Sequence, residues 1–176
     1  MFAEIVLITF AVFMIIAAIT AIGSLVVRVP YVPTPKRVIR KMLELADMKK
    51  GDVVYDLGCG DGRLLIEAHK HTPGIKAIGY ELPLGVWMLA KLKVFFSRQP
   101  VEIRIRDLFT ADLRDADVVF TYLLPEVMPK LQKKFDEELK KGATVISHGF
   151  EIKGKPYEHM ERVELPIWHF MRPSKQ

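Results

Sequence analysis

Three glycines alternate with other residues in the segment from Asp56 to Arg63, which reads DLGCGDGR. Strand-forming residues 53–55 precede this run and helix-forming residues 64–68 follow it, so the glycines are predicted to lie in a strand-to-helix turn. Glycine leaves no side chain between the backbone and a ligand. The helix that follows offers unpaired N–H groups to a polar or anionic group. The segment is therefore predicted to be a ligand site.

The spacing of the glycines distinguishes two classes of nucleotide ligand. A dinucleotide site has the pattern Gly-x-Gly-x-x-Gly, whereas Gly58, Gly60 and Gly62 follow the pattern Gly-x-Gly-x-Gly. Asp56 lies just before the turn, where a carboxylate would repel a pyrophosphate but attract the ammonium of a methionine moiety. The pattern therefore favours S-adenosylmethionine over NAD.

Two more acidic residues end the next two predicted strands. Glu81 follows the apolar run 77–80, and Asp107 follows the alternating segment 101–106. The carboxylate of Glu81 can accept hydrogen bonds from both ribose hydroxyls, and Asp107 can face the adenine amino group. The alternative is that Asp56, Glu81 and Asp107 are ordinary turn residues and the glycines form a plain loop.

The elements that must position these residues alternate between strand and helix patterns. Such alternation predicts an α/β fold, a Rossmann-like parallel sheet with helices on both faces. Two short strands near the C-terminus are predicted to form an antiparallel hairpin at the sheet edge. Predicted strands begin or lie at residues 53, 77–80, 101–106, 117–122, 143–147, 162–165 and 167–172, and predicted helices lie at 38–46, 64–68, 84–97 and 128–139.

The N-terminal stretch carries no charge from Ile5 through Val27. As a helix rising about 1.5 Å per residue it would be about 34 Å long, enough for a hydrocarbon core of about 30 Å. The alternatives fit less well, because a signal peptide would need positive charge before the stretch, where only Glu4 stands, and a core helix would have a polar face. One transmembrane helix is therefore predicted.

Basic residues follow this stretch closely. The positive-inside rule then predicts a single-pass membrane protein whose catalytic domain lies on the cytoplasmic or matrix-equivalent side. The chain has a net charge of +5, but anionic lipid headgroups explain an excess beside a membrane helix, so no nucleic-acid partner is expected. The basic residues are Arg28, Lys36, Arg37, Arg40 and Lys41.

The composition gives little support for a metal site or a disulfide. Cys59 is the single cysteine, which excludes an internal disulfide and a cysteine-based zinc site. The five histidines show no metal-ligand spacing. No metal is therefore predicted.

Four motifs together carry a resemblance to a known family. They are PYVPTP at 30–35, the glycine turn at 56–63, GYEL at 79–82 and PEVMP at 125–129. Over roughly residues 30–150 the chain resembles the seven-strand, Rossmann-like S-adenosylmethionine-dependent methyltransferases. Within them it is most similar to the membrane-anchored mitochondrial protein-lysine methyltransferases of the adenine nucleotide translocase and the ATP synthase c-subunit, and to their prokaryotic relatives. Cys59 departs from the serine usual in the eukaryotic members, and the part after Phe150 matches less well.

The resemblance implies a seven-strand sheet and a division of the chain into three parts. These are a transmembrane anchor at 1–28, a proline-rich connector and first helix at 29–50, and an S-adenosylmethionine-binding methyltransferase domain at 51–176. It also implies that the connector folds over the cofactor as a lid. The implied cofactor-binding residues are Tyr31, Thr34, Asp56, Gly58, Cys59, Gly60, Gly62, Arg63, Glu81, Leu82, Asp107 and Leu108.

In methyltransferases of this kind, the segment after the fourth strand normally faces the methyl group and its acceptor. Enzymes that methylate planar amides or base amines carry Asn/Asp-Pro-Pro-aromatic there, whereas residues 121–126 read TYLLPE, so adenine and glutamine are less favoured as acceptors. By resemblance, Tyr122 and Glu126 are candidate catalytic residues of an acceptor channel. The alternatives are a core role for Tyr122 and a helix N-terminal role for Glu126.

The expected function is therefore S-adenosylmethionine-dependent methylation of a lysine in a protein partner that is embedded in a membrane. One rival is a small-molecule or lipid methyltransferase. A second rival is an adaptor that binds the cofactor without catalysis.

Overall fold

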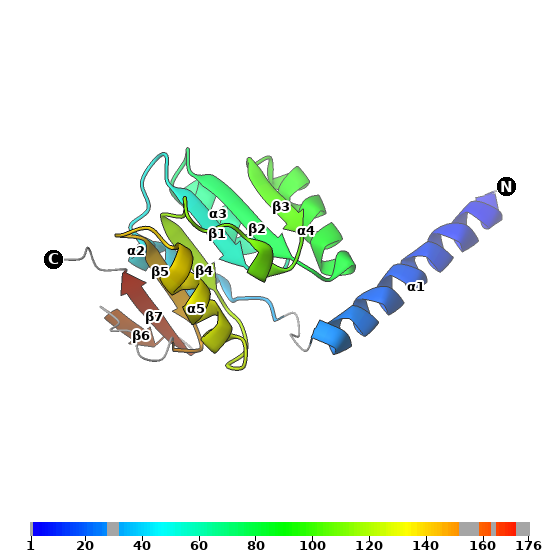
Figure 1. Ribbon diagram of the computed structural model, residues 1–176. Helices are drawn as coiled ribbons and strands as arrows, with labels where there is room; N and C mark the ends of the chain where they lie inside the picture. The colour runs from blue at the N-terminus through cyan, green and yellow to red at the C-terminus, as the bar shows by residue number, and fades with distance from the viewer. Residues whose placement is uncertain (1, 28–31, 152–158, 163–164, 172–176) are drawn as a thin grey trace.

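The computed structural model describes residues 2–27, 32–151, 159–162 and 165–171 (Figure 1). At its centre is a seven-stranded sheet with the order β3-β2-β1-β4-β5-β7-β6. Strands β1 to β5 are parallel, β7 runs antiparallel to β5, and β6 runs antiparallel to β7. The strands are β1 Val53–Leu57, β2 Lys76–Glu81, β3 Val101–Ile105, β4 Val118–Thr121, β5 Thr144–His148, β6 His159–Arg162 and β7 Pro166–Met171.

Helices cover both faces of the sheet, because successive strand residues point to opposite sides. Val54 and Phe120 pack on one face with α2, α3 and α4, whereas Tyr55 and Val119 pack on the other face with α5. The Rossmann-like α/β architecture that the sequence predicts is thus confirmed. The helices are α1 Phe2–Val27, α2 Lys36–Ala46, α3 Arg63–His71, α4 Leu84–Ser97 and α5 Met128–Glu138, with a short 3₁₀ helix η1 at Leu108–Thr110.

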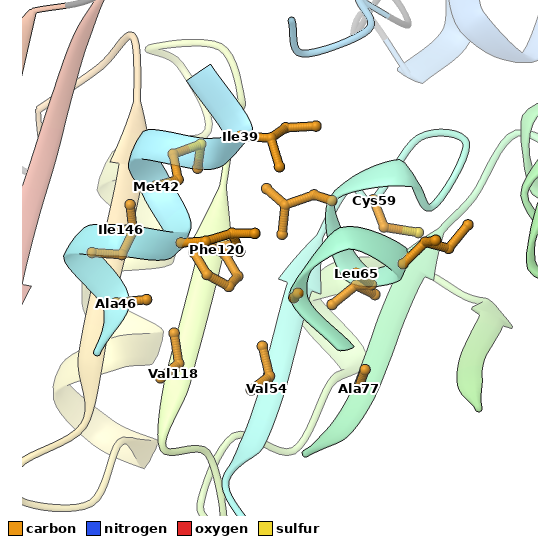
Figure 2. Packing of buried hydrophobic residues seen from close by; sticks show 14 of the residues in the cluster. Ile39, Met42, Ala46, Val54, Cys59, Leu65, Ala77, Val118, Phe120 and Ile146 are labelled. Atoms are coloured by element: carbon orange, nitrogen blue, oxygen red, sulfur yellow. The ribbon is translucent and has the colours of Figure 1, made fainter. Parts of the chain in front are cut away.

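Helix α2 belongs to the same core as the sheet. Its side chains Ile39 and Met42 belong to the same buried cluster as Phe120 of β4 and Ile146 of β5 (Figure 2). The apolar face that the sequence predicts for this helix is confirmed, since its buried residues recur at helical spacing. The segment that leads into α2 is thereby fixed against the sheet, close to the turn that follows β1.

The expected transmembrane anchor at residues 1–28 is wrong, as is the single-pass membrane localisation with a cytoplasmic or matrix-side catalytic domain. Within the described part of the chain, no helix has both the length and the apolar character that crossing a bilayer requires.

The C-terminal hairpin is present, but its first strand begins earlier than predicted. β6 covers His159–Arg162, whereas the alternation in the sequence places it at residues 162–165. β7 covers Pro166–Met171, close to the predicted 167–172. Alternation identifies a strand but not its register, which the pairing of β7 with β5 determines here.

Candidate functional site

A cavity of about 350 Å³ opens at the carboxyl ends of the central parallel strands. Its wall includes Asp56 from β1, Glu81 from β2 and Thr121 from β4. The order of the strands reverses between β1 and β4, because β2 and β3 lie on one side of β1, whereas β4 and β5 lie on the other. Ligands of open α/β sheets bind at such switch points, and the volume lies within the usual range of about 300–1,000 Å³.

Most of the residues predicted to bind the cofactor meet in this cavity. Gly62 does not line it and instead precedes α3 as its N-cap. Tyr31 lies outside the described residues. The predicted cofactor-binding residues that line the cavity are Thr34, Asp56, Gly58, Cys59, Gly60, Arg63, Glu81, Leu82, Asp107 and Leu108.

The glycine turn is shaped by its backbone angles. Gly58, Gly60 and Gly62 have φ values of 80°, 56° and 73°, a region that side chains disfavour. The N–H groups of Gly58 and Cys59 both donate to the carbonyl oxygen of Tyr80, at 2.9 and 3.0 Å. These two N–H groups are therefore used within the protein, and the turn contributes its shape and close backbone approach.

Glu81 connects the end of β2 to this turn. Its carboxylate accepts hydrogen bonds from the N–H of Gly60 at 2.6 Å and from the N–H of Leu82 at 3.2 Å. Burial raises the pKa of Glu81 to about 7, although these two N–H groups act in the opposite direction. The carboxylate thus lies in the cavity wall with a charge that the protein only partly compensates.

The carboxylate of Asp56 in the cavity wall has a raised pKa. Burial first, and then the negative charges of Glu81 and Asp61, raise this pKa to about 8. Burial and the same acidic neighbours also raise the pKa of the Cys59 thiol well above its usual value. A ligand with positive charge near Asp56 would relieve this repulsion. The ammonium and sulfonium groups of S-adenosylmethionine meet that requirement, so the residues present fit this cofactor.

Asp61, also in the cavity wall, is a candidate site residue that the sequence analysis did not identify. It is 1 % exposed, and its carboxylate pairs with the guanidinium of Arg63 at 2.7 Å and with the ammonium of Lys93 on α4. Nη1 of Arg63 also donates to the carbonyl oxygen of Thr34 at 3.4 Å. The buried acid therefore connects the glycine turn to α4 and, through Arg63, to the connector before α2. Lys93 lies 32 positions from Asp61, so no local motif signals the pair.

The segment after β4, which the sequence predicts to face the acceptor, lines another part of the cavity. Tyr122 lines the cavity, and its ring packs against the ring of His148 with the centroids 4.4 Å apart. A Cβ added at Gly149 would lie 3.1 Å from the Tyr122 ring, so the ring is confined on that side as well. Glu126 is exposed and does not line the cavity. The structure thus brings Tyr122, but not Glu126, to the cofactor residues.

Comparison with known proteins identifies the family. Residues 56–159 match the family described as the ANTKMT methyltransferase domain. The chain belongs to this family. The match begins at Asp56 and includes the glycine turn, Glu81, Asp107 and Tyr122.

Several relatives of this ANTKMT-family chain are named for an enzymatic activity. It is 41 % identical over 143 residues to a protein-lysine N-methyltransferase of Saccharolobus islandicus, covering 80 % of this chain and 89 % of that protein. It is 35 % identical over 128 residues to the adenine nucleotide translocase lysine N-methyltransferase of Mus musculus, covering 71 % and 55 %. It is 32 % identical over 134 residues to the ATP synthase c-subunit lysine N-methyltransferase of Rattus norvegicus, covering 74 % and 57 %. The chain thus spans little more than half of these two animal relatives.

Solved structures agree with this family assignment. A crystal structure described as an RNA methyltransferase from Salinibacter ruber, in complex with S-adenosyl-L-homocysteine, is 37 % identical, covers 82 % of this chain and 96 % of that one, and has a TM-score of 0.77. A ribosomal protein L11 methylase from Lactobacillus delbrueckii, at 20 % identity, 78 % coverage of each chain and a TM-score of 0.67, shares the fold. The ANTKMT-family chain is an S-adenosylmethionine-dependent methyltransferase, and S-adenosylmethionine is its cofactor. The expected family and cofactor are confirmed.

Proposed function

We propose that this enzyme transfers a methyl group to the side-chain amine of a lysine in a protein. The observation that carries the proposal is the 41 % identity to a protein-lysine N-methyltransferase along most of both chains. The acceptor side of the cavity supports it, because Tyr122, Leu124, Val127 and Phe150 offer an aromatic and apolar wall. Such a wall suits the four-carbon stem of a lysine.

The carboxylates along the strand ends are assigned to the cofactor in the order of the strands. We assign Asp56 to the ammonium of the methionine moiety, Glu81 to the ribose hydroxyls and Asp107 to the adenine amino group. The other predicted residues that line the cavity, with Thr34 from the connector, complete the wall. Tyr31 stays a prediction. We keep the division of the chain into a connector and first helix at 29–50 and a cofactor-binding methyltransferase domain at 51–176.

Methyl transfer to a lysine requires the protein to hold the positively charged cofactor and to bring a neutral amine to its methyl group. S-Adenosylmethionine supplies a methyl group on a positively charged sulfur, which is a good leaving group. The acidic wall of Asp56 and Glu81 holds positive charge at one end of the cavity. At the other end, the apolar wall beside Tyr122 disfavours a charged ammonium, which lowers the pKa of an entering lysine from about 10.4 and promotes loss of its proton. Alignment of the amine then provides most of the remaining rate enhancement.

The identity of the acceptor protein is a narrower question than its class. The names of two relatives specify the adenine nucleotide translocase and the ATP synthase c-subunit as acceptors of those enzymes. An acceptor embedded in a membrane stays a prediction for this chain, supported by the resemblance to those enzymes.

The test is a labelling experiment that separates the chemical classes of acceptor. The full chain is incubated with methyl-tritiated S-adenosylmethionine and a host-cell lysate, after which protein, RNA, lipid and small molecules are separated and the protein is hydrolysed. Methyl-lysine as the labelled product supports the proposal, and label should fall sharply with the Glu81→Gln variant. Label confined to RNA, lipid or small molecules would overturn it. Cofactor binding without any label would indicate an adaptor.

A further inference from the structure

A lysine of α5 lies over an aromatic ring of the cavity wall. The Nζ atom of Lys130 is 3.8 Å from the centroid of the Phe109 ring, and both residues line the cavity. At this distance the ammonium is attracted to the electron-rich face of the ring. The contact joins α5 to η1, two elements that follow different strands of the sheet.

The backbone of the same phenylalanine holds a predicted cofactor residue. The N–H of Phe109 donates to Oδ1 of Asp107 at 2.9 Å, and the hydroxyl of Thr110 donates to the carbonyl oxygen of Asp107 at 2.7 Å. Asp107 thus caps η1 with one carboxylate oxygen. The position of η1 therefore determines the direction in which the other oxygen points.

We propose that Lys130 is a positioning residue for the adenine end of the cofactor site, acting through the Phe109 ring on Asp107. This inference rests on the proposed assignment of Asp107 to the adenine amino group. Lys130 itself is exposed, and Phe109 is partly buried against the core beneath α5. The ammonium holds the ring in place from the α5 side, and the ring in turn keeps η1 and Asp107 at the cavity.

The expected effect of the contact on affinity is small, and a second lysine of α5 provides a control. Cation–π pairs at exposed positions contribute enough to change an affinity about two- to five-fold. Lys133 lies on the same helix, is exposed and pairs with Glu137 at 3.8 Å. A Lys133→Met variant removes the same charge from α5 without touching Phe109. Arginine at position 130 would keep both the charge and the ring contact.

The experiment measures binding of S-adenosylhomocysteine and of methylthioadenosine, which lacks the amino-acid part, to the full chain by calorimetry. Lys130→Met should weaken both ligands by the same factor of about two to five. Lys130→Arg should restore both affinities, and Lys133→Met should leave them unchanged. Unchanged affinity in Lys130→Met, or an equal loss in Lys133→Met, would overturn the inference.

A double-mutant cycle tests whether the effect passes through the ring. In a Phe109→Leu background, Lys130→Met should have no further effect, because the ring that it positions is absent. Additive losses would contradict the proposed route. Asp107→Ala separates this inference from its premise: if that variant binds both ligands normally, the adenine assignment fails, whereas weak binding by Asp107→Ala with normal binding by Lys130→Met overturns only the role of Lys130.

Discussion

The carboxylate of Glu81 accepts a hydrogen bond from the N–H of Gly60 at 2.6 Å, which joins the end of β2 to the centre of the glycine turn after β1. The second oxygen of the same carboxylate accepts from the N–H of Leu82. One side chain therefore fixes the backbone on both sides of the proposed ribose position.

Replacement of Glu81 by glutamine should weaken binding of S-adenosylhomocysteine by tenfold or more. The amide has one acceptor oxygen in place of two, so either the Gly60 N–H or a ribose hydroxyl loses its partner, at a cost of about 1–3 kcal/mol. Calorimetry measures the dissociation constant. Glu102→Gln, on the neighbouring strand β3 and paired with Arg104 at the surface, is the matched control and should bind normally. Unchanged affinity in the Glu81 variant would refute its assignment.

Binding of S-adenosylmethionine should strengthen as the pH rises from 6 to 7.5. Without ligand, the pKa of Asp56 is about 8 and that of Glu81 about 7, because of burial and, at Asp56, the neighbouring acids. A bound ammonium favours the ionised carboxylate and lowers its pKa, so binding below pH 8 releases protons and is opposed by acid. The range ends below about 7.7, where an α-amino group begins to lose its proton.

We expect binding to release one to two protons. Each released proton changes the affinity up to about tenfold per pH unit. Calorimetry in two buffers of different ionisation enthalpy measures the number of protons released. The Asp56→Asn variant should bind the cofactor more weakly and should release about one proton fewer on binding. An affinity independent of pH in the unaltered enzyme would be incompatible with the raised pKa values.

A methyl group at Gly79 should destabilise the fold and displace the glycine turn. A Cβ at this position would lie 2.6 Å from Sγ and 2.9 Å from Cβ of Cys59, and 3.0 Å from the Ile103 side chain. Overpacking of this kind typically costs about 1–3 kcal/mol. Urea denaturation of Gly79→Ala measures the loss in free energy of unfolding.

The Cys59→Ala change provides the matching test of that contact. It removes Sγ, so the Gly79→Ala change should cost less in the Cys59→Ala background than in the unaltered protein. Equal costs in both backgrounds would show that the thiol does not limit the space at Gly79.

Tyr122 and Glu126 should behave differently when altered. Tyr122→Ala removes the ring at the acceptor end and should raise the KM for the protein acceptor or lower kcat, while the affinity for S-adenosylhomocysteine stays within about twofold. Glu126→Gln should change neither, because Glu126 is exposed and lies away from the cavity wall. Steady-state kinetics of methyl transfer measures both effects. A large loss in Glu126→Gln would restore it as a catalytic candidate.

The residues that sequence reasoning located share one property: their signal is local. Asp56, Glu81 and Asp107 each end a strand or follow it closely, and parallel strands that end at one sheet edge bring their last residues together. The helical spacing of Ile39 and Met42 likewise predicted the face of α2 that is buried. Such patterns repeat over a few residues, so they can be read without knowledge of the tertiary structure.

Other parts of the site depend on contacts between distant segments. Lys93 of α4 pairs with Asp61, and Lys130 of α5 contacts the ring of Phe109. The spacing of these residues in the sequence predicts neither pair. The carbonyl oxygen of Tyr80 on β2 accepts from the N–H groups of Gly58 and Cys59, a contact between two strand ends that no local pattern predicts. The N-terminal stretch shows a different limit, because the absence of charge in a sequence does not establish a membrane-crossing helix.

The contact between Arg63 and Thr34 bears on how often the enzyme can renew its cofactor. Arg63 forms an ion pair with Asp61, and its Nη1 donates a hydrogen bond of 3.4 Å to the Thr34 carbonyl oxygen of the connector. Separation of the connector from the turn at this point breaks that weak bond and leaves the stronger ion pair intact. We therefore expect the spent cofactor to leave without rebuilding of the glycine turn, because the ion pair between Arg63 and Asp61 stays in place.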